Sequence, residues 1–310
     1  MAGDMEFMNK ERYNSFNTYL RKKYGCKVYK LSLNIGTTCP NRDGTKGTGG
    51  CIFCHGGSGA FAPDATIDIE AQIELAKQRV IAKTNDNKFI AYFQAYTNTY
   101  APIEFLKENF YKAINHNDIV ALSIATRPDC LQSDVIELLS ELNKIKPVTV
   151  ELGLQTIHEK TALLINRGYE LNEFDNAVKA LKKEGIEVVA HIILGLPFET
   201  NDDVLMTIKH LNEVKIDGIK LQLLHILKDT KLCEMYLNNE FNTMSINEYI
   251  DLLCLCIENL SPEIVIHRIT GDAPKSLLVA PEWSADKKKV LNTIKKEFEA
   301  RNIIQGRIHK

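Results

Sequence analysis

Three cysteines in the first fifth of the chain could together hold a metal. Cys39, Cys51 and Cys54 belong to the stretch CPNRDGTKGTGGCIFC, in which a glycine-rich loop separates the first cysteine from a close pair. Three thiolates are too few for a structural zinc, which takes four ligands, and too many for one disulfide. They can hold three irons of an iron–sulfur cubane and leave the fourth iron open to an outside ligand. The spacing therefore predicts a metal centre.

A zinc site completed by His55 or Cys26 is the alternative, because close Cys-x-x-Cys pairs are common in zinc sites. It lacks a second such pair, and a histidine directly after a ligand cysteine is poorly placed to join the same tetrahedron. The strand predicted over residues 30–35 ends just before the cysteines, at the C-terminal edge of a βα sheet, where active sites are built. The four glycines of NRDGTKGTGG let the loop wrap closely around a bulky inorganic group. This position favours iron and sulfur.

Six short β-branched or apolar runs must position this loop. They lie at residues 30–35, 88–95, 119–125, 148–154, 187–194 and 218–224. Between them, apolar residues recur with the helical period at residues 68–83, 103–115, 133–143, 172–184 and 202–213. Six βα units at this spacing predict an α/β protein with a parallel sheet. Periodicity alone leaves open whether the sheet curves into a barrel or stays flat and doubly wound.

After residue 225 the rhythm changes. The sequence predicts helices over residues 229–237 and 247–260, a seventh short strand over 265–269 and a basic amphipathic helix over 284–302. We expect these elements to close or cap an open side of the barrel. The expected organisation is a basic N-terminal extension over residues 1–29, a core over 30–225 and a C-terminal extension over 226–310.

Composition bounds the class of protein. With 310 residues, 45% of them hydrophobic, the chain can bury one large core. No apolar run approaches the roughly twenty residues of a membrane span, and MAGDMEFMNK at the start has acids where a secretory signal has positive charge. We therefore expect a cytoplasmic protein whose eight cysteines are thiols or metal ligands. Both ends are basic: residues 10–30 carry seven Lys or Arg against one Glu, and residues 286–310 carry eight against three acids.

The cysteine loop resembles that of the radical S-adenosylmethionine superfamily, in which a cysteine triad follows the first barrel strand and an aromatic residue, here Phe53, precedes the last cysteine. The eleven residues between Cys39 and Cys51 exceed the usual gap of the superfamily. They are similar to the gap in the branch that contains the catalytic Elongator subunit and the YhcC/YtqA-like proteins. Later stretches agree with this resemblance: ATRPD (125–129), ELGLQT (151–156), NRGY (166–169) and HIILGLPFET (191–200).

The resemblance implies a fold, cofactors and a partner. The implied fold is a partial, open TIM-type (β/α)6 barrel with C-terminal capping elements. Cys39, Cys51 and Cys54 would bind a [4Fe-4S] cluster whose open iron holds S-adenosylmethionine, and one electron would cleave this molecule to a 5′-deoxyadenosyl radical. A flavodoxin or ferredoxin is implied as the electron donor.

The resemblance also implies which residues contact S-adenosylmethionine. Phe53 would lie against the adenine. The methionine amino group would be bound at the end of the second strand, through the backbone of Gln94, Ala95, Tyr96 and Thr97. Gln155 and Arg167 match positions that contact the ribose and the carboxylate, and Gly195 and Pro197 would shape the turn beside the adenine.

Further polar residues at strand ends are candidates for catalysis or substrate binding: Arg127, His191, Lys220, Gln222, His225 and Arg268. We expect Arg127 to pair with Asp129 at the barrel top. His191, which stands where related enzymes carry Asp, is either a satisfied interior histidine or a substrate contact. The register that decides whether Lys220 and Gln222 face inward is open. The remaining cysteines, Cys26, Cys130, Cys233, Cys254 and Cys256, are expected to be small buried hydrophobic residues.

The basic ends with their tyrosines, as in RYNSFNTYLRKKYGCKVYK (12–30), could bind a phosphate backbone and stack on bases, or could be a solvated helix face. The resemblance favours tRNA as substrate. It implies modification of the C5 substituent of the wobble uridine, by shortening a carboxymethylaminomethyl group to aminomethyl. A radical enzyme acting on a small metabolite or porphyrin, and a zinc-stabilised RNA-binding protein without catalysis, are the two alternatives.

Overall fold

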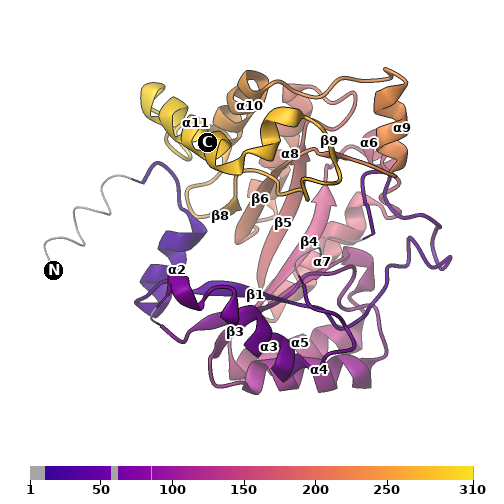
Figure 1. Ribbon diagram of the computed structural model, residues 1–310, viewed down its shortest axis with the longest axis vertical. Coiled ribbons are helices and arrows are strands. Elements are labelled where there is room, and N and C mark those ends of the chain that lie inside the picture. The colour runs from indigo at the N-terminus through magenta and orange to yellow at the C-terminus, as the bar shows by residue number, and fades with distance from the viewer. Residues whose placement is uncertain (1–10, 57–61, 85, 310) are drawn as a thin grey trace, which may run out of the picture.

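Seven parallel strands form the centre of the structure, a computed structural model that describes residues 11–56, 62–84 and 86–309. They are β1 (Tyr29–Leu33), β2 (Phe89–Phe93), β3 (Ile119–Thr126), β4 (Val148–Gln155), β5 (Glu187–Leu194), β6 (Gly218–Leu223) and β8 (Val265–Arg268). Neighbours pair in the order β1-β2-β3-β4-β5-β6-β8. The sheet curves into a half-barrel whose two edges are β1 and β8 (Figure 1). The predicted partial barrel is thereby confirmed over the flat alternative.

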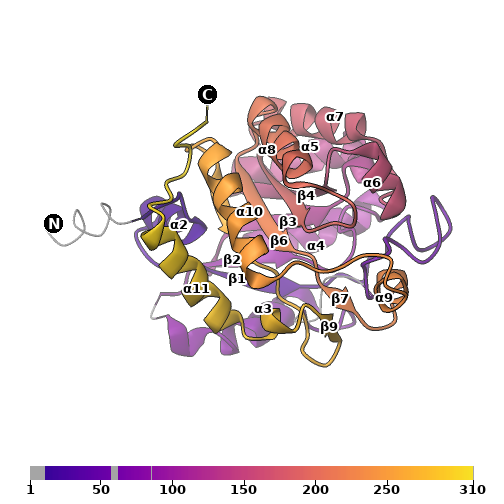
Figure 2. The same cartoon turned by 90° about the horizontal axis from the view of Figure 1, so that it is seen from above.

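Helices connect the strands and cover the outer face of the sheet (Figure 2). They are α3 (Ile69–Gln78), α4 (Ile103–Asn115), α5 (Ser133–Ile145), α6 (Glu159–Leu164), α7 (Leu171–Lys183) and α8 (Asn201–Glu213), with short 3₁₀ helices η1 (Ile81–Lys83) and η2 (Pro128–Cys130). α8 begins at a capping box, in which the Thr200 hydroxyl accepts from Asp203 N–H and the Asp203 carboxylate accepts from Thr200 N–H. Periodicity predicted α3, α4, α5, α7 and α8 but not α6, whose 6 residues are too few to show a period.

The side chains of each strand alternate between the two faces of the sheet. Outward-facing residues such as Leu152, Ala190 and Leu221 are fully buried against the helices, where they meet Phe110 and Leu139 in one large apolar core. This core holds the helices on the sheet. The inward-facing positions are consequently free to carry polar groups.

The C-terminal segment extends the sheet and covers one end of it. β8 pairs in parallel with β6, which confirms the predicted seventh strand. The helices of this segment are α9 (Lys231–Leu237), α10 (Ile246–Asn259), η3 (Glu282–Ala285) and α11 (Lys287–Ala300). An antiparallel pair of β7 (Ile226–Leu227) and β9 (Leu278–Ala280) was not predicted, because strands this short have no pattern. In the described residues no helix is long and apolar enough to cross a membrane.

The N-terminal helix α2 (Phe16–Tyr24) lies across the N-terminal end of the barrel. Its Leu20 packs against the inward-facing Ile90 of β2. At the other side, the Phe16 ring stacks on His267 of β8 at 3.9 Å between centroids. Residues 1–10 of the expected basic extension lie outside the described residues. The described part of that extension closes one end of the barrel.

We expect Leu20→Ala to lower the free energy of unfolding by about 2 to 5 kcal/mol, because the buried side chain fills the end of the barrel and its loss leaves a cavity. Urea denaturation measures this change. Asn17→Ala, an exposed position on the same helix, is the control and should change stability by less than about 0.5 kcal/mol. Equal effects of the two substitutions would contradict the role given to α2.

Candidate active site

The cysteine loop follows β1 and is pinned between two helices. Ile52, which is buried, donates its N–H to the carbonyl of Ile165 after α6 at 3.1 Å. Its own carbonyl accepts from the N–H of Leu232 in α9 at 3.0 Å. The loop therefore lies at the C-terminal end of the strands, as the sequence predicted, and spans from one side of the barrel mouth to the other.

The three cysteines of this loop are free and half-buried. Cys51 and Cys54 share a tight turn closed by a 2.9 Å backbone hydrogen bond. Burial, with the charge of Cys54 adding to it, raises the pKa of the Cys51 thiol to about 11, so binding there requires a cation that displaces the proton. No three Cys, His, Asp or Glu side chains converge into a preformed metal site in the described part of the chain. The donor set fits a group held by three thiolates, and the ligand assignment stays a prediction.

The two fourth ligands considered for the zinc alternative are Cys26 and His55, and the structure places Cys26 away from the triad. Cys26, which was expected to be buried, is only half-buried and packs against the α2 cluster around Leu20, at the opposite end of the barrel. His55 follows the triad, but its Nε2 lies 3.9 Å from the Asp229 carboxylate. Cys130, Cys233, Cys254 and Cys256 are buried, as expected of small hydrophobic residues.

Loops after neighbouring strands hold the cysteine loop in place. Asn41 donates its amide to the carbonyl of Asn166 at 2.5 Å, and Asn166 donates to the carbonyl of Gly50 at 2.8 Å. A Cβ at Gly168 would lie 2.8 Å from the Asn41 oxygen, and the residue has φ of +76°, so only glycine fits. The NRGY stretch is therefore a docking point for the cysteine loop.

Arg127 forms the expected internal pair. Its guanidinium donates to both carboxylate oxygens of Asp129 at 2.9 Å and to the carbonyl of Arg167 at 2.9 Å. Lys46 of the cysteine loop joins the same carboxylate at 2.6 Å. These contacts engage the donors of Arg127 inside the protein and hold neighbouring loops together, and its role toward the substrate stays a prediction.

Arg167 is 1% exposed and donates to the carbonyls of Thr156 and Tyr169 and to the Glu159 carboxylate. It ties the end of β4 to α6. In the structure Arg167 holds the surrounding loops in position. Its contact with the carboxylate of the cofactor stays a prediction.

Gln155 ends β4 beside a register shift, with φ of +69°. Its side-chain oxygen is buried and has no hydrogen-bond partner among the described residues. An unmatched buried acceptor costs free energy unless a ligand donates to it. This orphaned oxygen fits the predicted hydroxyl-bearing ribose.

The end of β2 turns sharply after Phe93. Ala95 and Thr97 are buried, whereas Tyr96 has φ of +59° and is 37% exposed. Thr97 N–H donates to the carbonyl of Thr38 just before the first cysteine. The predicted methionine-binding backbone of residues 94–97 therefore lies next to the cysteine loop.

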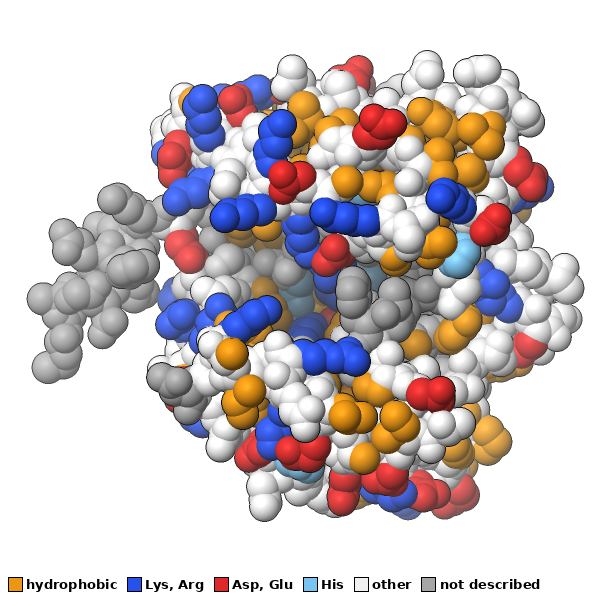
Figure 3. Space-filling view, in the orientation of Figure 1, with side chains coloured by type: hydrophobic (Ala, Val, Ile, Leu, Met, Phe, Trp, Pro, Cys, Tyr) orange, Lys and Arg blue, Asp and Glu red, His pale blue; other side chains and the backbone are white. Residues whose placement is uncertain are grey.

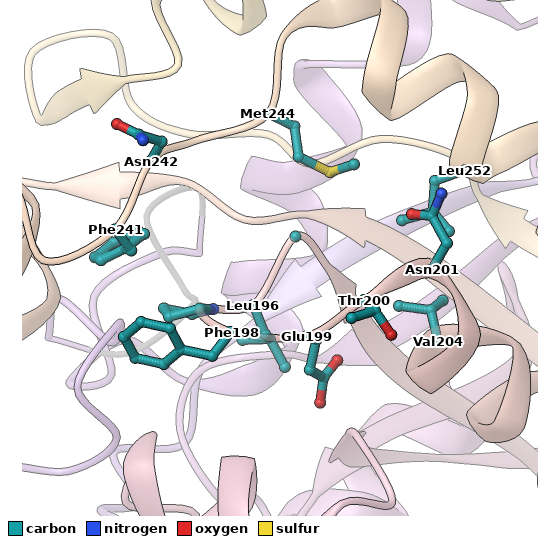
Figure 4. A pocket seen from close by; sticks show the side chains of 12 residues that line it. Leu196, Phe198, Glu199, Thr200, Asn201, Val204, Phe241, Asn242, Met244 and Leu252 are labelled. Atoms are coloured by element: carbon teal, nitrogen blue, oxygen red, sulfur yellow. The ribbon is translucent and has the colours of Figure 1, made fainter.

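The turn after β5 lines a cavity of about 260 Å³ (Figure 4). Gly195 has φ of +86°, and a Cβ there would lie 3.0 Å from the sulfur of Met244 on the opposite wall. Pro197 and Phe241 also line the cavity. Phe53 packs against the apolar cluster to which Phe241 belongs. Phe53, Gly195 and Pro197, predicted to surround the adenine, thus gather at one end of the barrel.

The barrel interior holds a polar network centred on Glu151, whose side chain is fully buried. One carboxylate oxygen accepts from Lys30 at 2.5 Å and from Ser123 at 2.8 Å. The other accepts from Tyr92 at 2.9 Å, from His191 at 2.8 Å and from Lys220. Six strands each contribute one of these residues. The sequence reasoning missed Glu151, although a charged residue within the apolar strand VTVELGL was a usable signal.

Charge compensation sets the pKa values in this network. Burial would raise the pKa of Glu151, but Lys220, Lys30 and His191 outweigh it and hold that pKa well below its usual range. Burial lowers the pKa of Lys220 to about 7, with Glu151 opposing the shift. It also lowers the pKa of His191 to about 4, so the ring is neutral at pH 7. His191 thus has the hydrogen-bond partners of a satisfied interior histidine, and a contact with the substrate stays a prediction.

The remaining candidates also face the interior. Gln222 donates to His191 Nδ1 at 3.4 Å, which shows that β6 turns Lys220 and Gln222 inward. His225 follows β6, and burial lowers its pKa to about 4. Arg268 ends β8 and is half-buried. These residues lie on the β5, β6 and β8 side of the barrel, whereas the cysteine loop follows β1 on the other side.

Comparison with known proteins agrees with this architecture. The profile of the Radical SAM superfamily matches residues 33–211, and that of the Radical_SAM C-terminal domain matches residues 216–300. The chain therefore belongs to the radical SAM superfamily. It is 47% identical over 298 residues to the protein YtqA of Bacillus subtilis, covering 96% of this chain and 92% of that one. The YhcC/YtqA-like branch is thereby confirmed.

More distant relatives carry names that describe a substrate. The tRNA uridine(34) acetyltransferase of Methanocaldococcus jannaschii is 28% identical over 167 residues, which span 52% of this chain and 30% of that protein. The solved archaeal Elp3 of Methanocaldococcus infernus superposes with a TM-score of 0.69 at 19% identity, covering 90% of this chain and 64% of that one. The second likeness shows the fold alone.

Family membership identifies the class as a radical enzyme that uses a [4Fe-4S] cluster and S-adenosylmethionine and requires a reductant. The bound group supplies one-electron radical chemistry. The chain's own residues would hold it at Cys39, Cys51 and Cys54 and enclose the space above Glu151.

We expect Cys54→Ala to lose most of the bound iron and the brown visible absorbance after anaerobic reconstitution, because two thiolates cannot hold the cluster. Iron analysis and the visible spectrum measure the loss. Cys26→Ala, at the other end of the barrel, is the matched control and should keep both. An unchanged iron content in Cys54→Ala, or a colourless zinc-bound wild type, would overturn the ligand assignment.

We expect Glu151→Gln to lower the free energy of unfolding at neutral pH by about 3 to 5 kcal/mol, because Lys30 and Lys220 lose their buried counterion. The folded pKa of Glu151 lies below its ordinary value of 4.5, so its contribution is complete above that pH and disappears as the pH falls further. Urea unfolding at several pH values between about pH 6 and pH 3 should show the difference from wild type shrinking. Glu137→Gln, an exposed control, should show neither effect.

Proposed function

We propose that this chain modifies the C5 substituent of the wobble uridine of tRNA, converting carboxymethylaminomethyl to aminomethyl. S-adenosylmethionine would take up the two electrons removed from the carbon next to the nitrogen, water would cleave the C–N bond, and the two carbons would leave as glyoxylate. The observation that carries the proposal is the open half-barrel, which is polar inside and flanked by basic side chains outside. Figure 3 shows Lys and Arg side chains on both sides of a hollow in this face. A nucleotide extended from a tRNA loop fits such an opening better than a fully enclosed metabolite would.

The two basic ends of the chain come together on one side of the molecule. Arg12 donates to the carbonyl of Ile303 at 3.2 Å, and Gln305 N–H donates to the carbonyl of Arg12 at 2.9 Å. Helices α2 and α11 consequently lie on the same side of the molecule in both views (Figures 1 and 2). Their exposed cations are Arg21, Lys22, Lys23, Lys288, Lys289, Lys295 and Lys296. Clustered cations of this kind attract a phosphate backbone.

The names of the relatives support the same substrate. The acetyltransferase relative is named for uridine 34 of tRNA, and the chain shares about half its length with that protein. The family requires a reductant, and we propose that a flavodoxin or ferredoxin supplies the electron.

We expect tRNA from cells that lack the gene to accumulate the carboxymethylaminomethyl nucleoside and to lose the aminomethyl products derived from it. Nucleoside mass spectrometry measures both. Anaerobically reconstituted wild type with S-adenosylmethionine and a reductant should convert this tRNA, whereas Cys54→Ala should not. An unchanged nucleoside profile would refute the proposal. The proposal would also be refuted if the affinity for tRNA did not weaken between about 50 mM and 200 mM salt. An enzyme that acts on small metabolites or porphyrins is expected to show no such salt-sensitive binding of tRNA.

A further inference from the structure

Arg268 stands out among the interior cations because its guanidinium has no hydrogen bond or ion pair with any residue in the described part of the chain. Its place in the sheet turns it inward. Ile266 of β8 pairs with Ile219, but Arg268 pairs with Lys220, so His267 is an extra residue in a bulge. Bulges re-aim side chains and are frequent beside active sites. Arg268 accordingly acts electrostatically on Lys220.

The barrel interior carries more positive than negative charge. Lys30, Lys220 and Arg268 face a single carboxylate, Glu151, which is already shared by the two lysines. A further acid after β8, Asp272, is paired with Lys287 of α11 at 2.5 Å. Among the described interior residues, Arg268 is therefore a cation that no carboxylate neutralises, and an added anion would complete the charge balance.

The surroundings of Arg268 would strengthen an ion pair formed there. The aromatic ring of Phe16 stacks on His267 and lies 4.9 Å from the Lys30 ammonium, which seals the interior from below. His225 lines the same wall, and burial keeps its ring neutral at pH 7. Charged hydrogen bonds gain strength in such a partly desolvated site. The planar guanidinium suits a carboxylate, which it can hold with two parallel hydrogen bonds.

We propose that Arg268 binds a carboxylate of the substrate and makes the enzyme selective for uridine substituents that end in one. This inference rests on the proposed function and deepens it: the carboxymethyl end of the substituent would enter the barrel and supply the missing anion. Lys220, next to Arg268 in register, would support the same carboxylate. The aminomethyl product lacks this group and would be released because the pairing is lost.

The test crosses two enzymes with two substrates. Anticodon stem-loop RNAs carry either 5-carboxymethylaminomethyluridine or the corresponding carboxamide at the wobble position, and reconstituted wild type and Arg268→Gln are compared on both. We expect wild type to bind the acid about 10- to 100-fold more tightly than the amide. Arg268→Gln should lose this preference while its affinity for the amide stays unchanged. Arg268→Lys should keep part of the preference.

Controls separate this role from other effects. Lys179→Gln, which removes an exposed charge on α7, should leave all affinities unchanged. A fall in affinity for both RNAs in Arg268→Gln, or a preference equal to that of wild type, would overturn the inference. A weaker affinity for S-adenosylmethionine with the acid preference intact would assign Arg268 to the cofactor's carboxylate and also overturn it. If wild type converts the acid RNA, these outcomes refute only the role of Arg268 in carboxylate selectivity. If wild type converts neither RNA, the proposed modification of tRNA is refuted as well.

Discussion

The half-barrel depends on one buried carboxylate. Glu151 of β4 takes hydrogen bonds or ion pairs from Lys30, Tyr92, Ser123, His191 and Lys220, one from each of five other strands. A charge in a water-poor interior is tolerated only when it is fully paired. A flat sheet would separate these strands, so the pairing requires the curvature. The same network that satisfies the charge therefore fixes the shape of the space in which the chemistry takes place.

The two faces of the sheet have different roles. The outer face is apolar and holds the helices, while the inner face is polar and stays open at the C-terminal ends of the strands. There, Arg127 and Arg167 use their donors on neighbouring loops, and Asn41 ties the cysteine loop to them. These bonds hold the rim of the site before any cofactor arrives, which lowers the cost of ordering it on binding.

The two basic termini contribute to the same side of the molecule although almost three hundred residues separate Arg12 from Ile303. α2 also seals the lower end of the barrel, so the N-terminal segment serves both structure and charge. The interior excess of positive charge and the exterior basic surface together suit a polyanion that presents an acidic substituent. This agreement links the proposed RNA substrate to the selectivity assigned to Arg268.

The sequence by itself determined the strands, most helices, the cysteine triad at a strand end and the family, because periodicity and motif spacing depend on neighbours in the chain. Only the tertiary structure decided that Lys220 and Gln222 face inward, that Lys220 reaches Glu151 while Gln222 reaches His191, and that Arg127 also donates to the carbonyl of Arg167. It also decided that a bulge in β8 turns Arg268 toward the interior, where its guanidinium has no hydrogen bond or ion pair with the residues that the structure describes. Charge compensation depends on register and curvature, which bring together residues that are distant in sequence, and no local pattern encodes either.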